Sequence, residues 1–296
     1  MRVLLALLLL LPAMLVASQP ALTVEAAARA VQPGEVVRLT ITTASPMTSL
    51  TVQAFETTFE SYRTTDTTWQ ALVGVDLDVA PGRHAVTITA TDGTRTHISS
   101  RTLVVSRKAF PTRRLTVEPK YVEPPAAVTA RILREAERLN AIWAARTPER
   151  LWSGPFTAPV PDRANSAFGS RSVFNGQPRS PHGGADFLSP TGRPIAAPNA
   201  GRIVLAEDLY YTGGTVVIDH GLGLVSLFAH LSAIDATVGT SVASGDVVGR
   251  VGATGRVTGP HLHWTVRLAG TRVDPLSLVD VSGQPDDAVV ATGFLP

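Results

Sequence analysis

Two histidines stand one residue apart in the stretch "PHLHW", as His261 and His263. In a β-strand, residues two apart point to the same face, with Cα atoms about 6.6 Å apart. His261 and His263 can therefore reach a common centre while Leu262 points into the core. This arrangement suits metal binding or acid–base chemistry, and the pair by itself does not say which histidine does which.

A carboxylate and a further histidine extend this set of residues. The stretch "SPHGGADF" places His182 four residues before Asp186, and the glycines between them favour extended backbone over a helix. Another histidine, His230, lies in the apolar run "LVSLFAHL", which is typical of a buried strand. The sequence thus places a group of histidines and one aspartate within a single β-rich region.

The number of these residues exceeds what one catalytic metal needs. Catalytic zinc takes three protein ligands and leaves a position open for water. A metallohydrolase also needs a group that accepts a proton and one that stabilises the charged transition state. The chain has no HExxH glutamate and no cysteine, so the spare histidines are the candidates for those roles, although spacing does not say which are spare.

Composition narrows the class of protein. The formal net charge of +2 over 296 residues, with no dense Lys or Arg run, gives no sign of a nucleic-acid surface. Residues 1–18 have one basic residue, an apolar run and small residues, which is typical of a signal peptide. The run is shorter than the ~20 apolar residues of a spanning helix. We expect export without stable membrane insertion after cleavage, with an uncleaved anchor as the alternative.

The rest of the chain divides by its patterns into four segments. Short apolar–polar alternations separated by turns predict an immunoglobulin-like β-sandwich over 19–107. A linker over 108–154 contains one amphipathic helix with mixed charges. A second all-β domain spans 155–280, and 281–296 form a tail without strong pattern. The predicted fold class is therefore all-β, with a helical linker.

The order of motifs in the second domain resembles one family. The stretches "FGSRSVFNGQPRSPHGGADF", "GGTVVIDHGLGLVSLFAHLS", "VASGDVVGRVGATGRVTGPHLHW" and "VDPLSLV" resemble the lysostaphin/LytM-type zinc metallopeptidases over roughly residues 155 to 280. The resemblance implies a β-sheet groove and hydrolysis of peptide bonds in bacterial peptidoglycan.

The resemblance also implies a role for each residue of the set. Carried over position by position, it makes His182, Asp186 and His263 the ligands of Zn²⁺, and it implies no other cofactor. It makes His261 the general base, and His230 the residue that orients water or stabilises the oxyanion. A histidine with an ordinary pKa of about 6.5 suits a water whose pKa zinc lowers to about 7.

These features predict an exported zinc endopeptidase, periplasmic or secreted, that cuts peptide cross-links of peptidoglycan. The alternative is a non-catalytic LytM-like module that activates another wall hydrolase, since some such domains have lost their ligands. The sequence does not distinguish a D-alanyl-diaminopimelate bond from a glycine bridge as the cleaved link, nor does it name a partner of the N-terminal domain.

Overall fold

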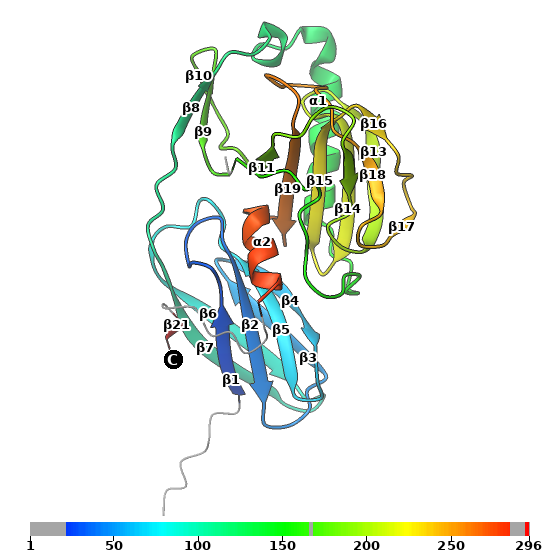
Figure 1. Ribbon diagram of the computed structural model, residues 1–296. Coiled ribbons are helices and arrows are strands. Elements are labelled where there is room, and N and C mark those ends of the chain that lie inside the picture. Colours follow the sequence, from blue (N-terminus) through cyan, green and yellow to red (C-terminus); the bar gives the residue numbers. More distant parts are fainter. Residues whose placement is uncertain (1–21, 166–167, 285–293, 296) are drawn as a thin grey trace, which may run out of the picture.

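Alternating apolar residues between Leu22 and Val105 form a β-sandwich, the lower part of the molecule in Figure 1. The computed structural model describes residues 22–165, 168–284 and 294–295, so the signal peptide predicted over 1–18 lies outside the described residues. Inward-facing side chains such as Val36, Ile41 and Ile88 are fully buried. The sandwich strands are β1 (Leu22–Ala27), β2 (Val36–Thr43), β3 (Ser49–Ala54), β4 (Thr57–Arg63), β5 (Thr68–Gly74), β6 (Gly82–Thr91) and β7 (Thr96–Val105).

These strands pair antiparallel in the order β1-β2-β5-β4-β3-β6-β7, with β21 (Phe294–Leu295) on the edge strand β7. The pairing of β21 gives part of the predicted tail a place in the sandwich. No helix in the described stretches is both long and apolar enough to cross a membrane.

A second antiparallel sheet forms the core of the C-terminal domain. Its strand order is β11-β19-β15-β14-β13-β17, with β20 paired to β19, and a small sheet of order β12-β18-β16 lies beside it. The strands are β11 (Gly184–Phe187), β12 (Pro194–Ala196), β13 (Gly201–Leu209), β14 (Gly213–Gly221), β15 (Leu224–Leu231), β16 (Ala233–Ile234), β17 (Ser241–Val242), β18 (Val247–Arg250), β19 (Leu262–Leu268) and β20 (Thr271–Val273). The predicted all-β class is confirmed.

The amphipathic helix α1 (Ala126–Ala144) packs on one face of this sheet, behind β14 and β15 in Figure 1. Its residues Leu139, Ile142 and Trp143 contact a buried apolar cluster. That cluster consists of Leu205, Leu209, Val217, Val225, Leu227 and Ala229. The helix therefore covers the face of the C-terminal sheet that would otherwise expose these side chains to water.

The segment before α1 joins the C-terminal domain through a strand. Strand β8 (Thr112–Leu115) pairs in parallel with β9 (Arg171–Phe174), which pairs with β10 (Gln177–Arg179). A short 3₁₀ turn, η1 (Pro119–Tyr121), follows β8. The pattern of residues 112–115 did not predict this strand, because its partner lies about 60 residues further along the chain.

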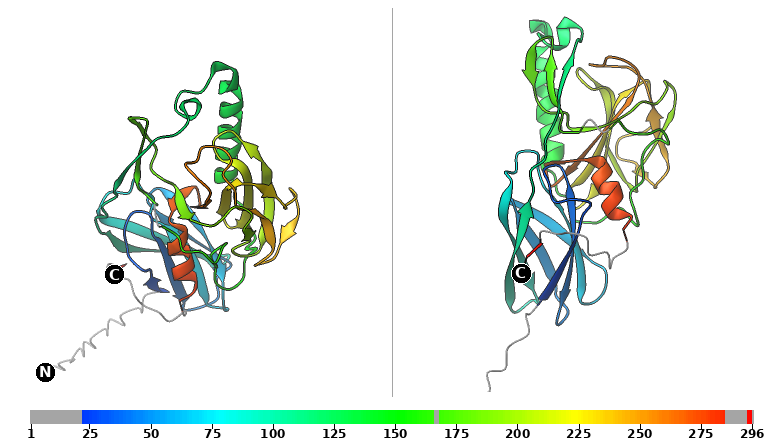
Figure 2. Two further views of the ribbon diagram at one scale, coloured as in Figure 1. Left: turned by 45° about the horizontal axis from the view of Figure 1, so that its top comes forward. Right: turned by 60° about the vertical axis from the view of Figure 1, so that its left-hand side comes forward.

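A second helix, α2 (Pro275–Ser282), was not predicted from the sequence. The Asp274 side chain accepts a hydrogen bond from the backbone N–H of Leu276 (3.0 Å), and Pro275 occupies the first helical position. An Asp-Pro pair is a recognised start signal for a helix, but the helix has only eight residues, too few to show a periodic pattern. In Figures 1 and 2, α2 lies between the sandwich and the C-terminal sheet.

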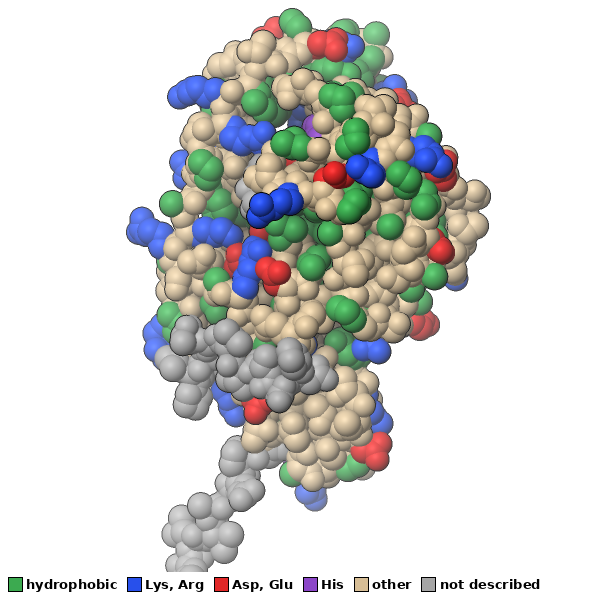
Figure 3. Space-filling view, viewed as in Figure 1, with side chains coloured by type: hydrophobic (Ala, Val, Ile, Leu, Met, Phe, Trp, Pro, Cys, Tyr) green, Lys and Arg blue, Asp and Glu red, His purple; other side chains and the backbone are tan. Residues whose placement is uncertain are grey.

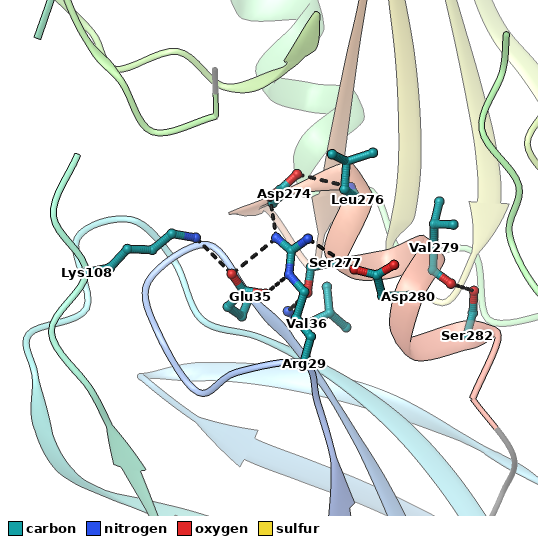
Figure 4. Close-up of polar contacts among 10 residues, drawn as sticks. All are labelled: Arg29, Glu35, Val36, Lys108, Asp274, Leu276, Ser277, Val279, Asp280 and Ser282. Carbon is teal, nitrogen blue, oxygen red and sulfur yellow. Dashed lines mark hydrogen bonds and ion pairs between the residues drawn. The ribbon is translucent and has the colours of Figure 1, made fainter. Parts of the chain in front are cut away.

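Charged and polar groups join α2 to the sandwich, as Figure 4 shows. Arg29 donates to Glu35 (2.5 Å) and to Asp274, and Lys108 donates to Glu35 (2.8 Å). Burial by itself raises the pKa of Glu35, but the hydrogen bonds from Arg29 and Lys108 outweigh it and lower that pKa. The Ser277 hydroxyl accepts from the backbone N–H of Val36 (2.8 Å). Glu35 is therefore a buried, ionised acceptor within this junction.

A second group of contacts links β20 to the loop after β5. The backbone N–H of Arg272 donates to Asp76 (2.7 Å), and its guanidinium contacts both Asp76 and Asp78. At Gly74 a Cβ atom would lie 2.3 Å from the Thr271 hydroxyl, so the two backbones approach closely there. The contacts at α2 and at β20 therefore both attach the sandwich to the C-terminal domain.

We predict that Arg272→Met lowers the free energy of unfolding at pH 7 by about 1–3 kcal/mol, because it leaves Asp76 half-buried without its cation. The folded-state pKa of Asp76 lies below its ordinary 3.8, so the stabilisation is complete above pH 3.8 and is lost as the pH falls below that value. Urea denaturation at several pH values measures the difference, with Arg83→Met, an exposed arginine of β6, as the control. An undiminished difference at pH 2 would contradict this account.

Candidate active site

Strand pairing brings Asp186 opposite His263. Strands β11 and β19 are antiparallel neighbours, and these two residues are partners in their register. Asp186 Oδ1 lies 2.9 Å from His263 Nδ1 and 3.0 Å from His182 Nε2. The three donor atoms lie within 4.8 Å of one another. His182 is held just before β11, where its backbone N–H donates to the Ser170 carbonyl (2.9 Å).

The electrostatics of this cluster favour a cation. Asp186 is 6% exposed. Burial by itself raises the pKa of Asp186, but hydrogen bonds from His182 and His263 outweigh it and hold that pKa well below its usual range. Burial also lowers the pKa of His263. One ionised carboxylate between two imidazoles is a donor set that suits Zn²⁺, and three ligands leave a coordination position open.

Two further residues contact the atoms of His263 and Asp186 that face away from the cluster. The Thr265 hydroxyl lies 2.9 Å from His263 Nε2, the ring nitrogen that faces away from Asp186. Arg113 on β8 lies 3.5 Å from Asp186 Oδ2, the oxygen that does not face the histidines. Such outer contacts fix the orientation of metal-binding side chains. Sequence reasoning missed Arg113, since nothing in the linker pattern distinguishes it from its neighbour Arg114.

His261 and His230 lie beside the cluster with their rings oriented by the backbone. His261 Nδ1 is 2.9 Å from the Gly259 carbonyl, and His230 Nδ1 is 2.9 Å from the Thr254 carbonyl. A carbonyl only accepts, so each Nδ1 carries the proton and each Nε2 keeps a lone pair. The two ring centres are 4.9 Å apart, and His261 Nε2 lies 3.8 Å from Asp186 Oδ1.

The backbone at His230 adopts a conformation that is uncommon for a residue with a side chain. Its φ is +70°, in the left-handed region, at the end of β15. Strain of this kind persists where the surroundings impose it, often at functional sites. Burial lowers the pKa of His230 to about 3, with smaller contributions from His263 and His261, so the ring is neutral at pH 7.

These side chains line a groove of about 690 Å³, including its open mouth. Figure 3 shows histidine surface at the bottom of a hollow near the top of the molecule. All five residues singled out from the sequence line it. Its other walls are Arg113, Leu115, Val117, Ser172, Phe174, Tyr211, Thr212, Arg256, Val257 and Thr258. Part of one wall therefore comes from β8 and the residues after it, outside the region where the sequence motifs lie.

The remaining histidines of the chain lie elsewhere. His84 and His97 belong to the sandwich, where His84 bonds the Ala80 carbonyl (2.7 Å). His220 is fully buried in β14, between the Ala200 carbonyl (2.8 Å) and the Ser226 hydroxyl (2.9 Å). These contacts give His220 a structural role away from the groove.

We predict that Gly184→Ala weakens zinc binding at least about 10-fold, because a Cβ there would lie 2.9 Å from the His263 ring and 2.3 Å from the Trp264 carbonyl. Gly183→Ala is the matched control, since nothing lies within 4 Å of its Cβ. Competition with a chromophoric chelator measures both affinities. Equal zinc affinity in the two variants would show that the close approach at Gly184 is not needed to position His263.

Comparison with known proteins agrees with this geometry. The family model for peptidase family M23 matches residues 180–275. Over 97 residues the chain is 42% identical to the DD-carboxypeptidase/endopeptidase Mpg of Neisseria meningitidis serogroup B, a match that covers 33% of this chain and 22% of that protein. It is 39% identical over 97 residues to the peptidoglycan DD-endopeptidase ShyA of Vibrio cholerae, covering 33% of this chain and 23% of that protein. The match thus spans about a fifth of the length of these curated relatives.

A solved structure extends the similarity to most of the chain. The crystal structure of an M23 peptidase from Pseudomonas aeruginosa matches with a TM-score of 0.66 and 31% identity, covering 86% of this chain and 96% of that one. Together with the His-Asp-His cluster, the family supports the Zn²⁺ cofactor predicted from the sequence. From the matched motifs, the shared fold and the shared architecture, the chain is a member of peptidase family M23.

Proposed function

We propose that this protein is a zinc-dependent endopeptidase that hydrolyses peptide cross-links in bacterial peptidoglycan. The observation that carries the proposal is the group of donor atoms of His182, Asp186 and His263 within 4.8 Å of one another, at the bottom of an open groove. The names of the curated relatives, which include a peptidoglycan DD-endopeptidase, support the substrate.

The metal ligands in this proposal are His182 Nε2, Asp186 Oδ1 and His263 Nδ1, the atoms that face one another. Zinc, when bound, supplies a Lewis acid that polarises the scissile carbonyl and lowers the pKa of water. Thr265 and Arg113 keep the ligands in position from outside.

His261 acts as the general base. The Gly259 carbonyl holds the proton on Nδ1 (2.9 Å), so Nε2 has a lone pair to accept the proton of the attacking water. The same nitrogen then returns that proton to the leaving amine. His230 Nε2 also has a free lone pair, because Nδ1 bonds the Thr254 carbonyl. Because Nε2 of His230 accepts a hydrogen bond and donates none, it can orient the attacking water but cannot stabilise a negatively charged oxygen.

The intact cluster favours an enzyme over a non-catalytic activator. An activator needs neither an ionised Asp186 in a buried site nor two histidines whose tautomers leave a lone pair toward the groove. Action outside the cytoplasm, in the periplasm or as a secreted protein, follows from the signal-peptide pattern of residues 1–18 and from the location of the substrate.

We predict that the chain beginning at residue 19 releases soluble peptides from purified peptidoglycan sacculi, and that a chelator stops the release and added zinc restores it. Mass analysis of the fragments identifies the cleaved bond. The His261→Ala variant serves as the control for contaminating hydrolases. Absence of release by a preparation with one zinc per chain would contradict the proposed activity.

We predict that His261→Ala retains zinc and lowers kcat by about 10²–10⁴-fold, the usual contribution of a general base. His263→Ala should lose zinc and activity together, because it removes a ligand. Metal content and turnover measure the two effects separately, with His84→Ala in the sandwich as a control. Loss of zinc in His261→Ala would argue instead that His261 is a ligand.

A further inference from the structure

Arg256 lies in the groove wall between two aromatic rings. Its guanidinium carbon is 4.8 Å from the ring centre of Phe174 on β9 and 4.9 Å from that of Tyr211. Its backbone N–H donates to the Tyr211 carbonyl (2.8 Å), which fixes the loop that carries it. Contacts of this kind hold the plane of a guanidinium and leave its N–H edge available for a ligand.

This guanidinium has no acidic partner. Within the described ranges of the chain, the Arg256 side chain makes no hydrogen bond or ion pair. Burial, and to a smaller extent the nearby Arg179, lowers the pKa of Arg256. A largely buried cation without a counter-charge is unfavourable unless a ligand supplies that charge.

A second arginine in the same place, Arg179, likewise has no acidic partner among the residues that the structure describes. Arg179, at the end of β10, donates through Nη2 to the Val122 carbonyl and to Gln177 Oε1, both at 2.7 Å. Its Nε is buried and has no hydrogen-bond partner. Both acceptors are neutral, so the positive charge of Arg179 adds to that of Arg256.

The two arginines share a pocket with the metal-binding histidines. Arg179, Arg256, Ser172 and Phe174 line a recess together with His182 and His263, and this recess adjoins the main groove. Among the described residues that line the two, Asp186 is the only carboxylate, and it is held by the histidines and by Arg113. The recess is therefore positive, adjacent to the candidate metal site and without an acid of its own.

We propose that Arg179 and Arg256 form a subsite that binds a free carboxylate of the peptide substrate, close to the bond that is cleaved. The inference rests on the proposed peptidase function and specifies its substrate class. A guanidinium binds a carboxylate through two parallel hydrogen bonds, which gives both energy and orientation. The aromatic contacts hold Arg256 before the ligand arrives, so little side-chain entropy is lost on binding.

The subsite separates two kinds of cross-link. An oligoglycine bridge carries no side-chain carboxylate, whereas a peptide with an acidic side chain or a free α-carboxylate beside the bond offers one. The ligand chemistry is the same for an acidic side chain and for a terminal α-carboxylate, and matched peptides distinguish these two sources.

The test uses the zinc-loaded chain and synthetic peptides in matched pairs. In the first pair, the side chain next to the cleaved bond ends in a carboxylate in one peptide and in a carboxamide in the other. In the second pair, the C-terminus is a free carboxylate in one peptide and a carboxamide in the other. We expect kcat/KM to be about 10–100-fold higher for the carboxylate member of one pair, since charge-assisted hydrogen bonds are lost in the other member. In Arg256→Gln this ratio should fall to near 1, while Arg256→Lys should keep part of it.

The control variant is Arg171→Gln, which removes an exposed arginine at the start of β9, outside the groove lining. It should keep the wild-type ratio. Equal rates for both members of each pair with the wild-type chain, or an equal fall of both rates in Arg256→Gln, would overturn the subsite.

A binding measurement separates this inference from the proposed function. Zinc-loaded His261→Ala should turn peptide over at least about 100-fold more slowly, so calorimetry with each pair measures carboxylate preference independently of hydrolysis. If His261→Ala binds the carboxylate peptide more tightly and the double variant His261→Ala/Arg256→Gln does not, the subsite is supported, whether or not the chain is active. Absence of that preference, in a chain that does cut sacculi, refutes the subsite and leaves the peptidase function standing.

Discussion

The active site depends on the pairing of β11 with β19, which sets the Asp186 carboxylate against the His263 ring. Backbone hydrogen bonds fix the register of these strands, and a shift of one strand by one residue would turn its side chain to the opposite face of the sheet, away from its partner. Gly184 permits the close approach, because any side chain there would meet the His263 ring. The buried carboxylate stays ionised through this contact and the one with His182, so the capacity to hold a cation follows directly from the strand register.

The N-terminal half contributes to the site through its connection to the C-terminal domain. The sandwich is attached at α2 by Arg29 and Glu35 and at β20 by Arg272. After the sandwich, the chain forms β8, which pairs with β9. This pairing places Arg113 beside Asp186 Oδ2, the oxygen that does not face the histidines. The recess with Arg179 and Arg256 lies on the β9–β10 side of the groove. The region ahead of the peptidase motifs thus helps both to orient a candidate metal ligand and to shape the groove beside it.

Sequence patterns were informative where the chemistry is local. Period-two alternation predicted strands such as β6, which has a buried and an exposed face, and apolar runs predicted fully buried strands such as β15. The HxH spacing predicted that His261 and His263 would share a side. Sequence patterns did not predict an element that depends on a distant partner strand or a helix that is very short. Strand β8 exists only because β9 offers an edge, and α2 has only eight residues and depends on its Asp274 cap. An arginine in a groove wall has the same local pattern as an arginine exposed to solvent, so Arg113, Arg179 and Arg256 carried no signal.

Composition, periodicity and ordered motifs were enough to predict the all-β class, the residue types available for the chemistry and the five candidate residues. Which atoms of those residues face one another depends on how the strands pair in space. The tautomers of His261 and His230 depend on the carbonyls of Gly259 and Thr254, and the ionisation of Asp186 depends on burial and two histidines. Hydrogen bonding and desolvation are properties of neighbours in space, and residues far apart in the chain become neighbours only when the strands pair.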